Sequence, residues 1–210
     1  MLCVNVHFRV ECSDMTDPLM HDTSSDARSA SSRSLVAYTV VALGLALFIR
    51  FFIAAPYIVS GASMEPSFNN FHYLIIDRVS YELGEPHRGE VIVFDLPQNT
   101  SRALIKRVIG LPGETVAING NVVSIINDEH PEGFKLDEPY LDPKNLGGMS
   151  GVRAELGADE YFVLGDNRKV SADSRIWGIL PREDIVGRVF LRLYPLSKIS
   201  LFPGSAEYGD

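Results

Sequence analysis

The sequence predicts a mainly β domain that follows a single N-terminal apolar segment. Two observations lead to this prediction. Residues 35–59 form an apolar run whose only charged residue is Arg50, and hydrophobic residues alternate with a period of two from residue 70 onward. This alternation is typical of strands, because successive side chains point to opposite faces of a sheet. No run beyond residue 70 shows helical periodicity over several turns, so little helix is expected there.

The composition sets limits on the class of protein. A chain of 210 residues is long enough for one domain and a membrane anchor, and its 46% apolar residues exclude wholesale disorder. The formal net charge of −8 argues against nucleic acid as a main partner. Both cysteines, Cys3 and Cys12, precede the apolar segment. Neither a disulfide framework nor a cysteine-rich zinc site is therefore available beyond it.

The N-terminal part is predicted to be a disordered cytoplasmic tail, residues 1–34, followed by a transmembrane signal anchor, residues 35–56. The tail is polar and rich in Ser toward its end. Arg50 interrupts the apolar run, but an arginine near a helix end can extend its side chain to the membrane interface. A buried core helix is less favoured because the run lacks a polar face. A cleaved signal peptide is less favoured because the run begins late and is long.

The distribution of basic residues predicts the orientation of this anchor. Arg28 and Arg33 precede the apolar run, whereas the first Lys or Arg beyond Val59 is Arg78. Positive charges concentrate on the cytoplasmic side of membrane proteins. The N-terminus is therefore expected in the cytoplasm, and the β domain on the other face of the membrane.

The β domain, residues 57–200, is predicted to contain strands wherever the alternation is clear. These segments are 73–77, 90–94, 104–109, 115–118, 121–126, 161–164 and 186–193. Asn119-Gly120 is a strong hairpin signal between the two segments that it separates. Residues 127–158, rich in Pro, Gly, Asp and Glu, are expected to form a long loop or a small inserted subdomain. Residues 201–210 are expected to form a C-terminal tail.

Ser63 is a candidate nucleophile because it stands just after the apolar run, in the segment 60–66. Gly61 and Ala62 allow close approach of the backbone, and Pro66 prevents the segment from becoming a helix. A serine in such a turn usually serves the turn alone. The functional interpretation requires a base that activates the hydroxyl.

Lys106 is the candidate base. Alternation in the predicted strand 104–109 places Leu104, Lys106 and Val108 on one face. A lysine in this position either protects an edge strand from aggregation or is desolvated by its neighbours. In the second case its amine is neutral near pH 7 and can accept a proton.

The polar stretch at residues 165–178 is either a solvated loop or part of a packed site. Asp173 and Arg175 flank Ser174 and are followed by the only tryptophan, Trp177. A packed ion pair there would hold the loop in place rather than add much net stability.

Four motifs together resemble those of type I signal peptidases, and the resemblance covers the membrane anchor and essentially all of residues 50–195. In order, they are Ser63-Met64-x-Pro66, Gly89–Phe94, Lys106–Glu114 and Gly165–Gly178 with Ser171, Asp173 and Arg175 inside it. Each motif alone is modest, but their order after one apolar segment is specific. The resemblance implies an antiparallel β-sheet catalytic domain of the signal-peptidase type. It also implies localisation at a bacterial plasma membrane or a thylakoid membrane.

The implied activity is that of a membrane-bound serine endopeptidase with a Ser/Lys dyad and an acyl-enzyme intermediate, without metal or cofactor. Ser63 is the implied nucleophile, Lys106 the base and Ser171 the residue that orients the lysine. The implied substrates are exported preproteins, cut after small residues in an Ala-x-Ala pattern, and membrane lipid is the other partner.

The resemblance also assigns supporting residues. A structural ion pair is implied for Asp173 and Arg175, with Asp166 and Arg107 in the same network. The implied substrate pockets are lined by Tyr57, Val59 and Ile105.

The oxyanion site departs from the best-known Gram-negative pattern. That pattern has a serine where this chain has Gly61, which leaves the Ser63 backbone N–H as one oxyanion donor. The second donor stays open.

Three alternative functions remain at this stage. A Ser/His/Asp hydrolase is disfavoured because none of the 5 histidines has a recognisable catalytic context and no Gly-x-Ser-x-Gly motif occurs. A catalytically silent, membrane-tethered β domain that binds exported proteins would need neither Ser63 nor Lys106. A self-cleaving Ser/Lys repressor is disfavoured by the apolar segment and by the lack of a DNA-binding segment.

Overall fold

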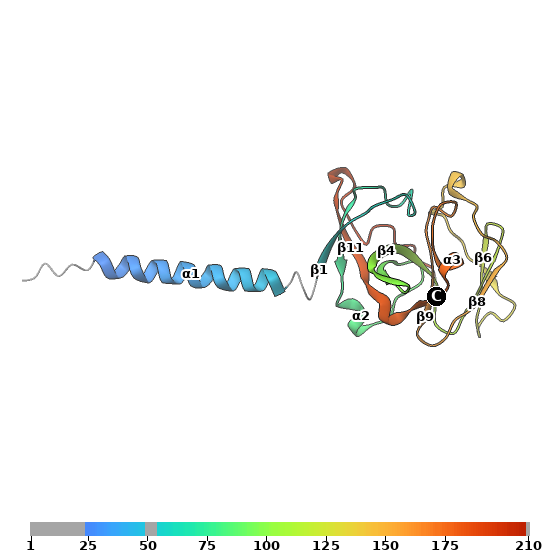
Figure 1. Cartoon of the computed structure of the whole chain (residues 1–210), viewed down its shortest axis with the longest axis horizontal. Helices are drawn as coiled ribbons and strands as arrows, with labels where there is room; N and C mark the ends of the chain where they lie inside the picture. Colours follow the sequence, from blue (N-terminus) through green and yellow to red (C-terminus); the bar gives the residue numbers. More distant parts are fainter. Residues whose placement is uncertain (1–23, 49–53, 209–210) are drawn as a thin grey trace, which may run out of the picture. The chain divides into compact units, whose positions relative to one another are not determined.

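The computed structural model describes residues 24–48 and 54–208, and the chain divides into two compact units, Met1–Leu45 and Ala46–Asp210 (Figure 1). The predictions for Cys3, for Cys12 and for the tail before residue 24 lie outside the described residues. The first unit contributes most of helix α1, and the second contains all the described strands.

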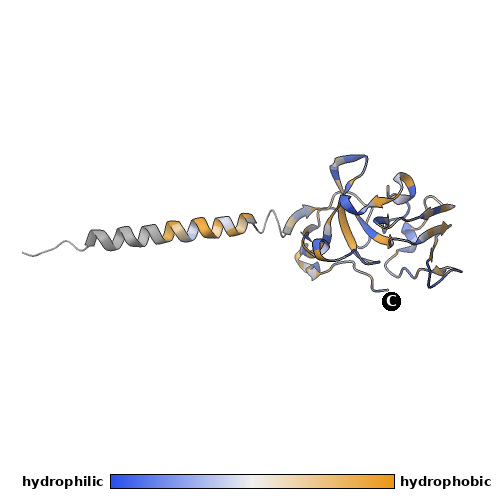
Figure 2. Ribbon diagram, turned by 90° about the horizontal axis from the view of Figure 1, so that it is seen from below, coloured by the Kyte–Doolittle hydropathy of each residue, from blue (hydrophilic) through white to orange (hydrophobic). Residues whose placement is uncertain are grey.

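Helix α1 spans Ser24–Phe48, so it begins earlier than the sequence predicts. The sequence analysis placed residues 24–34 in a disordered tail, whereas the structure describes their backbone as helical. Helix propagation costs less than nucleation, so an apolar helix can extend into a neighbouring Ala- and Arg-containing segment. From Leu35 onward α1 is mainly apolar (Figure 2). Within residues 24–48 and 54–208, no helix combines the length and the hydropathy needed to cross a membrane.

The main sheet of the second unit is antiparallel throughout. Its strands run in the order β1 (Ala54–Ile58), β2 (Tyr73–Asp77), β11 (Ile185–Tyr194), β3 (Val91–Leu96), β4 (Asn99–Gly110), β9 (Glu160–Leu164) and β10 (Leu180–Pro181), and β12 (Ser200–Leu201) pairs with β11. The mainly β, antiparallel prediction for this domain is confirmed.

A second, four-stranded antiparallel sheet has the order β7 (Phe134–Lys135), β6 (Val122–Ile126), β5 (Thr115–Asn119) and β8 (Val152–Glu155). The predicted hairpin joins β5 to β6, with Asn119 paired to Val122 and Gly120 at φ 61° in the turn. Within the second unit, β6 and β8 lie on the side opposite β1 and β11 (Figure 1). The segment 127–158 therefore adds β7 and β8 to this sheet.

Each strand predicted from the alternation is present, but β1 was missed. Ala54–Pro56 were assigned to the apolar anchor, whereas they form the start of β1 and pair with β2 from Ala54 opposite Asp77. An apolar run that contains Pro56 carries no period-two signal. Only pairing with β2 makes this segment a strand.

The helical elements of the second unit are short. They are α2 (Ser80–Leu83), α3 (Ser174–Trp177) and the 3-10 turns η2 (Pro143–Asn145), η3 (Arg182–Asp184) and η4 (Leu196–Lys198). One apolar cluster of the core lies directly under the segment that carries Ser63. It consists of Val59, Met64, Phe68, Leu74, Ile76, Val91, Val93 and Val189.

Residues 201–208 contact other parts of the second unit and do not form a free C-terminal tail. Leu201 belongs to β12, the Gly204 carbonyl accepts a hydrogen bond from Arg107, and the Ala206 N–H donates to the Gly89 carbonyl at 3.2 Å. The Tyr208 hydroxyl lies 3.1 Å from that of Tyr140. These contacts are made with residues far away in the sequence, which is why the local pattern did not indicate them.

Candidate active site

Ser63 lies in the segment that connects β1 to β2 and is held by buried neighbours. Met64 and Phe68 are almost completely buried in the core, and the Phe68 N–H donates to the Met64 carbonyl at 2.8 Å. The Ser63 carbonyl accepts a hydrogen bond of 3.0 Å from the Asn167 N–H. These contacts hold the backbone around Ser63 in place, while the residue itself stays partly exposed.

Lys106, in the middle of β4, extends its amine to the Ser63 hydroxyl. Nζ lies 2.9 Å from Ser63 Oγ, and it also donates to the Ile105 carbonyl at 2.8 Å. Only 2% of the lysine is exposed. The two residues that the sequence singled out are therefore in direct hydrogen-bond contact.

Burial lowers the pKa of Lys106 to about 8, from an ordinary value of 10.5. Desolvation is the main cause, because a charged ammonium loses its hydration in this environment. The carboxylates of Asp173 and Asp166 act in the opposite direction and limit the decrease. A sizeable fraction of the amine is thus neutral in mildly alkaline solution and able to accept a proton.

Ser171 makes no hydrogen bond to Lys106. Its Oγ is buried and has no hydrogen-bond partner in the part of the chain that the structure describes. The expectation that this hydroxyl orients the lysine is thus not met by a hydrogen bond here. Gly165 lies between Ser171 and the Ser63 backbone: a Cβ at Gly165 would lie 2.5 Å from Ser63 O and from Ser171 Cβ, and even closer to Ser171 Oγ.

Gly165→Ala should lower kcat/KM for the peptide hydrolysis that the resemblance implies by at least about 100-fold. The added methyl group would displace either Ser63 or Ser171, and displacement of a reacting group by about 1 Å costs roughly this factor. Steady-state kinetics on the purified full chain measures the effect. Gly84→Ala is the matched control, because its Cβ would meet only the Ser80 carbonyl, at 3.5 Å, and the backbone there is extended. Equal activity of the two variants would contradict the proposed close packing.

The predicted ion pair between Asp173 and Arg175 is present and buried. Nε donates to Oδ1 and Nη2 to Oδ2, both at 2.8 Å. Asp173 also accepts from the Gly165 N–H at 3.1 Å, and Arg175 donates to the Arg168 and Gly147 carbonyls. The pair thus connects the Gly165 backbone to the loop that carries Ser171.

Arg107 and Asp166 form a second bidentate pair, with Nε–Oδ1 at 2.9 Å and Nη2–Oδ2 at 2.6 Å. Both side chains are at most 1% exposed. Arg107 also donates to the Gly89 carbonyl at 2.8 Å, and its guanidinium carbon lies 3.7 Å from the Tyr140 ring centroid. The predicted network therefore consists of two ion pairs, and their aspartates stand at the two ends of the segment 166–173.

Tyr57, Val59 and Ile105 line one cavity next to the Ser63 hydroxyl. The cavity has a volume of about 110 Å³, and Lys106 and Leu74 also line it. Its wall is mainly apolar and its size suits a small side chain. We call it the Tyr57 cavity.

Gly61 has φ +100°, a conformation that favours glycine, and its N–H donates to Asn70 Oδ1 at 3.1 Å. This N–H is therefore already paired. The Ser63 N–H donates no hydrogen bond to any described residue. Its role as the first oxyanion donor stays a prediction.

The family model described as "Signal peptidase, peptidase S26" matches residues 32–194. The chain belongs to the signal peptidase family S26. It is accordingly a serine peptidase, a hydrolase that acts in the removal of signal peptides from exported preproteins.

Curated relatives support this family membership. "Probable signal peptidase I-2" of Synechocystis sp. is 37% identical over 202 residues, which cover 92% of this chain and 88% of the relative. "Signal peptidase I" of Leptolyngbya laminosa is 40% identical over 164 residues, covering 74% and 76%. A crystal structure of a signal peptidase I from Enterococcus faecalis V583 matches with 31% identity and a TM-score of 0.43, and it covers 50% of this chain and 97% of that one.

Several residues of the candidate site were missed in the sequence. Arg168 and Glu138 form another buried bidentate ion pair, and Arg168 Nε donates to the Gly165 carbonyl at 3.1 Å. Asn70 holds Gly61, and Tyr140 covers Arg107. Glu138, Asn70 and Tyr140 lie outside the four motifs, so no local pattern distinguished them from ordinary loop residues.

Proposed function

We propose that Ser63 and Lys106 are the catalytic nucleophile and general base of this signal peptidase. The observation that carries the proposal is the 2.9 Å contact between Lys106 Nζ and Ser63 Oγ, made by a lysine that is 2% exposed. A nucleophile within hydrogen-bond reach of a desolvated amine is the arrangement that acyl transfer requires. A catalytically silent domain would have no use for such a contact.

In the proposed mechanism, Ser63 Oγ attacks the carbonyl carbon of the scissile peptide as its proton moves to neutral Lys106. The negative charge on the carbonyl oxygen is stabilised by the Ser63 N–H. The C–N bond then breaks, and the Lys106 ammonium donates its proton to the departing amine. Water, deprotonated by Lys106, attacks the ester carbonyl. As the bond to Ser63 Oγ breaks, the Lys106 ammonium returns the proton to Oγ, which releases the acid and restores the free enzyme.

The proposed specificity is for small residues at the first and third positions before the cut. The volume of the Tyr57 cavity, about 110 Å³, supports this assignment because it leaves little room for a large side chain. An extended precursor would lie between the segment 57–63 and β4, with alternate side chains entering the pockets.

Ser171 and the two buried ion pairs are proposed to position the dyad. The Ser171 hydroxyl has no hydrogen-bond partner among the described residues, and both it and the Ser63 carbonyl lie next to Gly165. Asp173–Arg175 and Asp166–Arg107 would hold the loops that carry these groups.

We propose that residues 35–56 include a membrane anchor, with a cytoplasmic N-terminus and the β domain on the outer face of a plasma or thylakoid membrane. The apolar side chains of α1 are exposed on all sides of the helix, as lipid contact would require; they are Leu35, Val36, Tyr38, Val40, Val41, Leu43, Leu45 and Leu47. The lack of Lys and Arg between Val59 and Arg78 supports the orientation. Glycosylation mapping or protease protection of the full chain in vesicles would test it.

The pH dependence of cleavage tests the dyad. Only neutral Lys106 can act as a base, so kcat/KM should rise about tenfold per pH unit below pH 8 and level off above it. The measurement is cleavage of an Ala-x-Ala precursor by the full chain in detergent between pH 6 and 10, with circular dichroism as the control for folding. A rate that is flat over this range, or that still rises at pH 10, would contradict a buried lysine base.

A further inference from the structure

A second pocket adjoins the candidate dyad. It has a volume of about 440 Å³ and shares Ser60, Ser63, Leu104 and Lys106 with the Tyr57 cavity. Its remaining wall comes from other parts of the fold: Gly61, Ala62, Leu96, Arg102, Val170, Ala172 and Trp177. We call it the Trp177 pocket.

If the proposed function is correct, each of the two pockets contacts a different part of the substrate. The scissile carbonyl must lie at Ser63 Oγ, where both pockets meet. If the Tyr57 cavity takes small residues before the cut, the chain after the cut leaves Ser63 along the Trp177 pocket. This pocket would then contact the first residues of the mature protein.

The wall of the Trp177 pocket is well defined. The Trp177 ring packs on Phe94 with a centroid distance of 5.6 Å, and its carbonyl accepts from Gln98 at 3.1 Å. On the floor, Leu104 and Lys106 come from the same face of β4 as Arg102, because alternate residues of a strand share a face. A side chain that enters here therefore meets a fixed apolar wall with a cation at its outer end.

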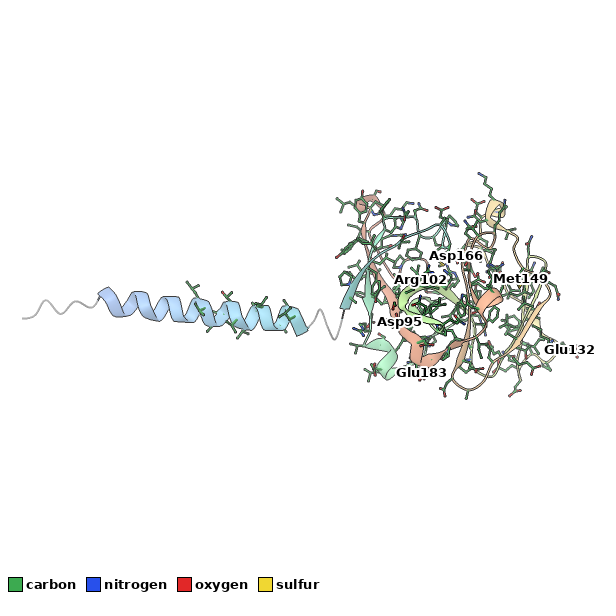
Figure 3. All side chains as sticks on the ribbon, in the orientation of Figure 1. Asp95, Arg102, Glu132, Met149, Asp166 and Glu183 are labelled. Carbon is green, nitrogen blue, oxygen red and sulfur yellow. The ribbon has the colours of Figure 1, made fainter. Side chains whose placement is uncertain are left out.

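Arg102 is exposed and makes no ion pair or hydrogen bond with the described residues. Its side chain is among those labelled in Figure 3. No lining residue of the Trp177 pocket carries a carboxylate. Asp95, on the neighbouring strand, pairs in register with Ala103, so its side chain belongs to the opposite face of the sheet. The guanidinium is thus available to a carboxylate of another chain.

We propose that the Trp177 pocket binds the first residues after the cleavage site and that Arg102 makes it favour an acidic residue there. Arg102 is then a specificity-determining residue for the mature end of the preprotein, separate from the small-residue requirement before the cut. The interaction is an exposed charge pair, so its strength should fall with added salt.

The test uses the full chain in detergent and precursor peptides with one Ala-x-Ala end. Glu, Gln or Lys is placed in turn at the first, second and third positions after the cut. At one or more of these positions, the ratio of kcat/KM for Glu to that for Gln should be about 3 at low salt and approach 1 at high salt. Arg102→Gln should bring the ratio to about 1. Arg102→Glu should bring it below 1 and should make the Lys peptide a better substrate than the Gln peptide. Arg153→Glu, an equal charge change at an exposed site on β8 of the second sheet, is the control and should keep the ratio of the unmodified enzyme.

The outcomes separate this inference from the proposed function. A ratio of 1 at all three positions in the unmodified enzyme, or a ratio that both Arg102 variants leave unchanged, overturns the inference and leaves the proposed dyad standing, because the peptides are still cut. An equal shift in Arg153→Glu also overturns it, because net charge alone would then account for the effect. Failure of the unmodified enzyme to cut any of the peptides, or equal cleavage by Ser63→Ala, would instead overturn the proposed function.

Discussion

Lys106→Ala should lower kcat for cleavage of an Ala-x-Ala precursor by about 10⁴-fold or more. The variant retains Ser63 but loses the amine that lies 2.9 Å from its hydroxyl, and no other base among the described residues contacts that oxygen. Loss of a nucleophile or its base commonly has an effect of this size in serine peptidases. A gel-based cleavage assay on the full chain measures it.

Ser63→Ala should have an equal effect, and the double variant should be no worse than either single one. Groups that act as one unit are strongly non-additive, because removing one already abolishes the contribution of the other. Lys135→Ala, which removes an exposed lysine of the second sheet, and His87→Ala should keep normal rates. Cleavage that persists in Lys106→Ala at near-normal rate would exclude the lysine as base.

Asp166→Asn should lower the free energy of unfolding by about 3–5 kcal/mol. The substitution leaves the Arg107 guanidinium completely buried without its counter-charge, and breaking such a pair costs far more than the intact pair contributes. Urea unfolding of the full chain, followed by tryptophan fluorescence of Trp177, would measure the change as a lower midpoint at constant slope.

Glu85→Gln is the matched control for this prediction. Glu85 pairs with Arg182 at 3.2 Å, but 73% of its side chain is exposed, and exposed pairs contribute at most about 1 kcal/mol. The amide oxygen can still accept from the Tyr161 hydroxyl, now 2.7 Å from the carboxylate. Equal losses in the two variants would show that burial of the Arg107–Asp166 pair has no special energetic role.

The strands of the β domain could be predicted because alternation is a local property of the chain. In β5 and β6 successive side chains point to opposite faces of the sheet, so the alternation and the Asn119-Gly120 signal were sufficient to predict the hairpin. The boundaries of the domain could not be predicted in this way. Strand β1 exists only because it pairs with β2, and residues 201–208 are ordered by contacts with Arg107, Gly89 and Tyr140.

The candidate site shows the same division. Motif order and resemblance were enough to select Ser63 and Lys106, which lie 43 positions apart, and to select the pairs Asp173–Arg175 and Asp166–Arg107. They did not indicate Asn70, Glu138 or Tyr140, since these residues act only through partners brought near by folding.

By itself the sequence determined the β character of the domain and the residue types available for catalysis, because both are encoded in local pattern and motif. Only the tertiary structure decided how those residues behave. The pKa of Lys106 is lowered to about 8 by burial under residues distant in the chain, and the hydroxyl of Ser171 has no hydrogen-bond partner among the described residues. Desolvation and hydrogen bonding depend on what surrounds an atom in space, and the order of residues along the chain does not specify those surroundings.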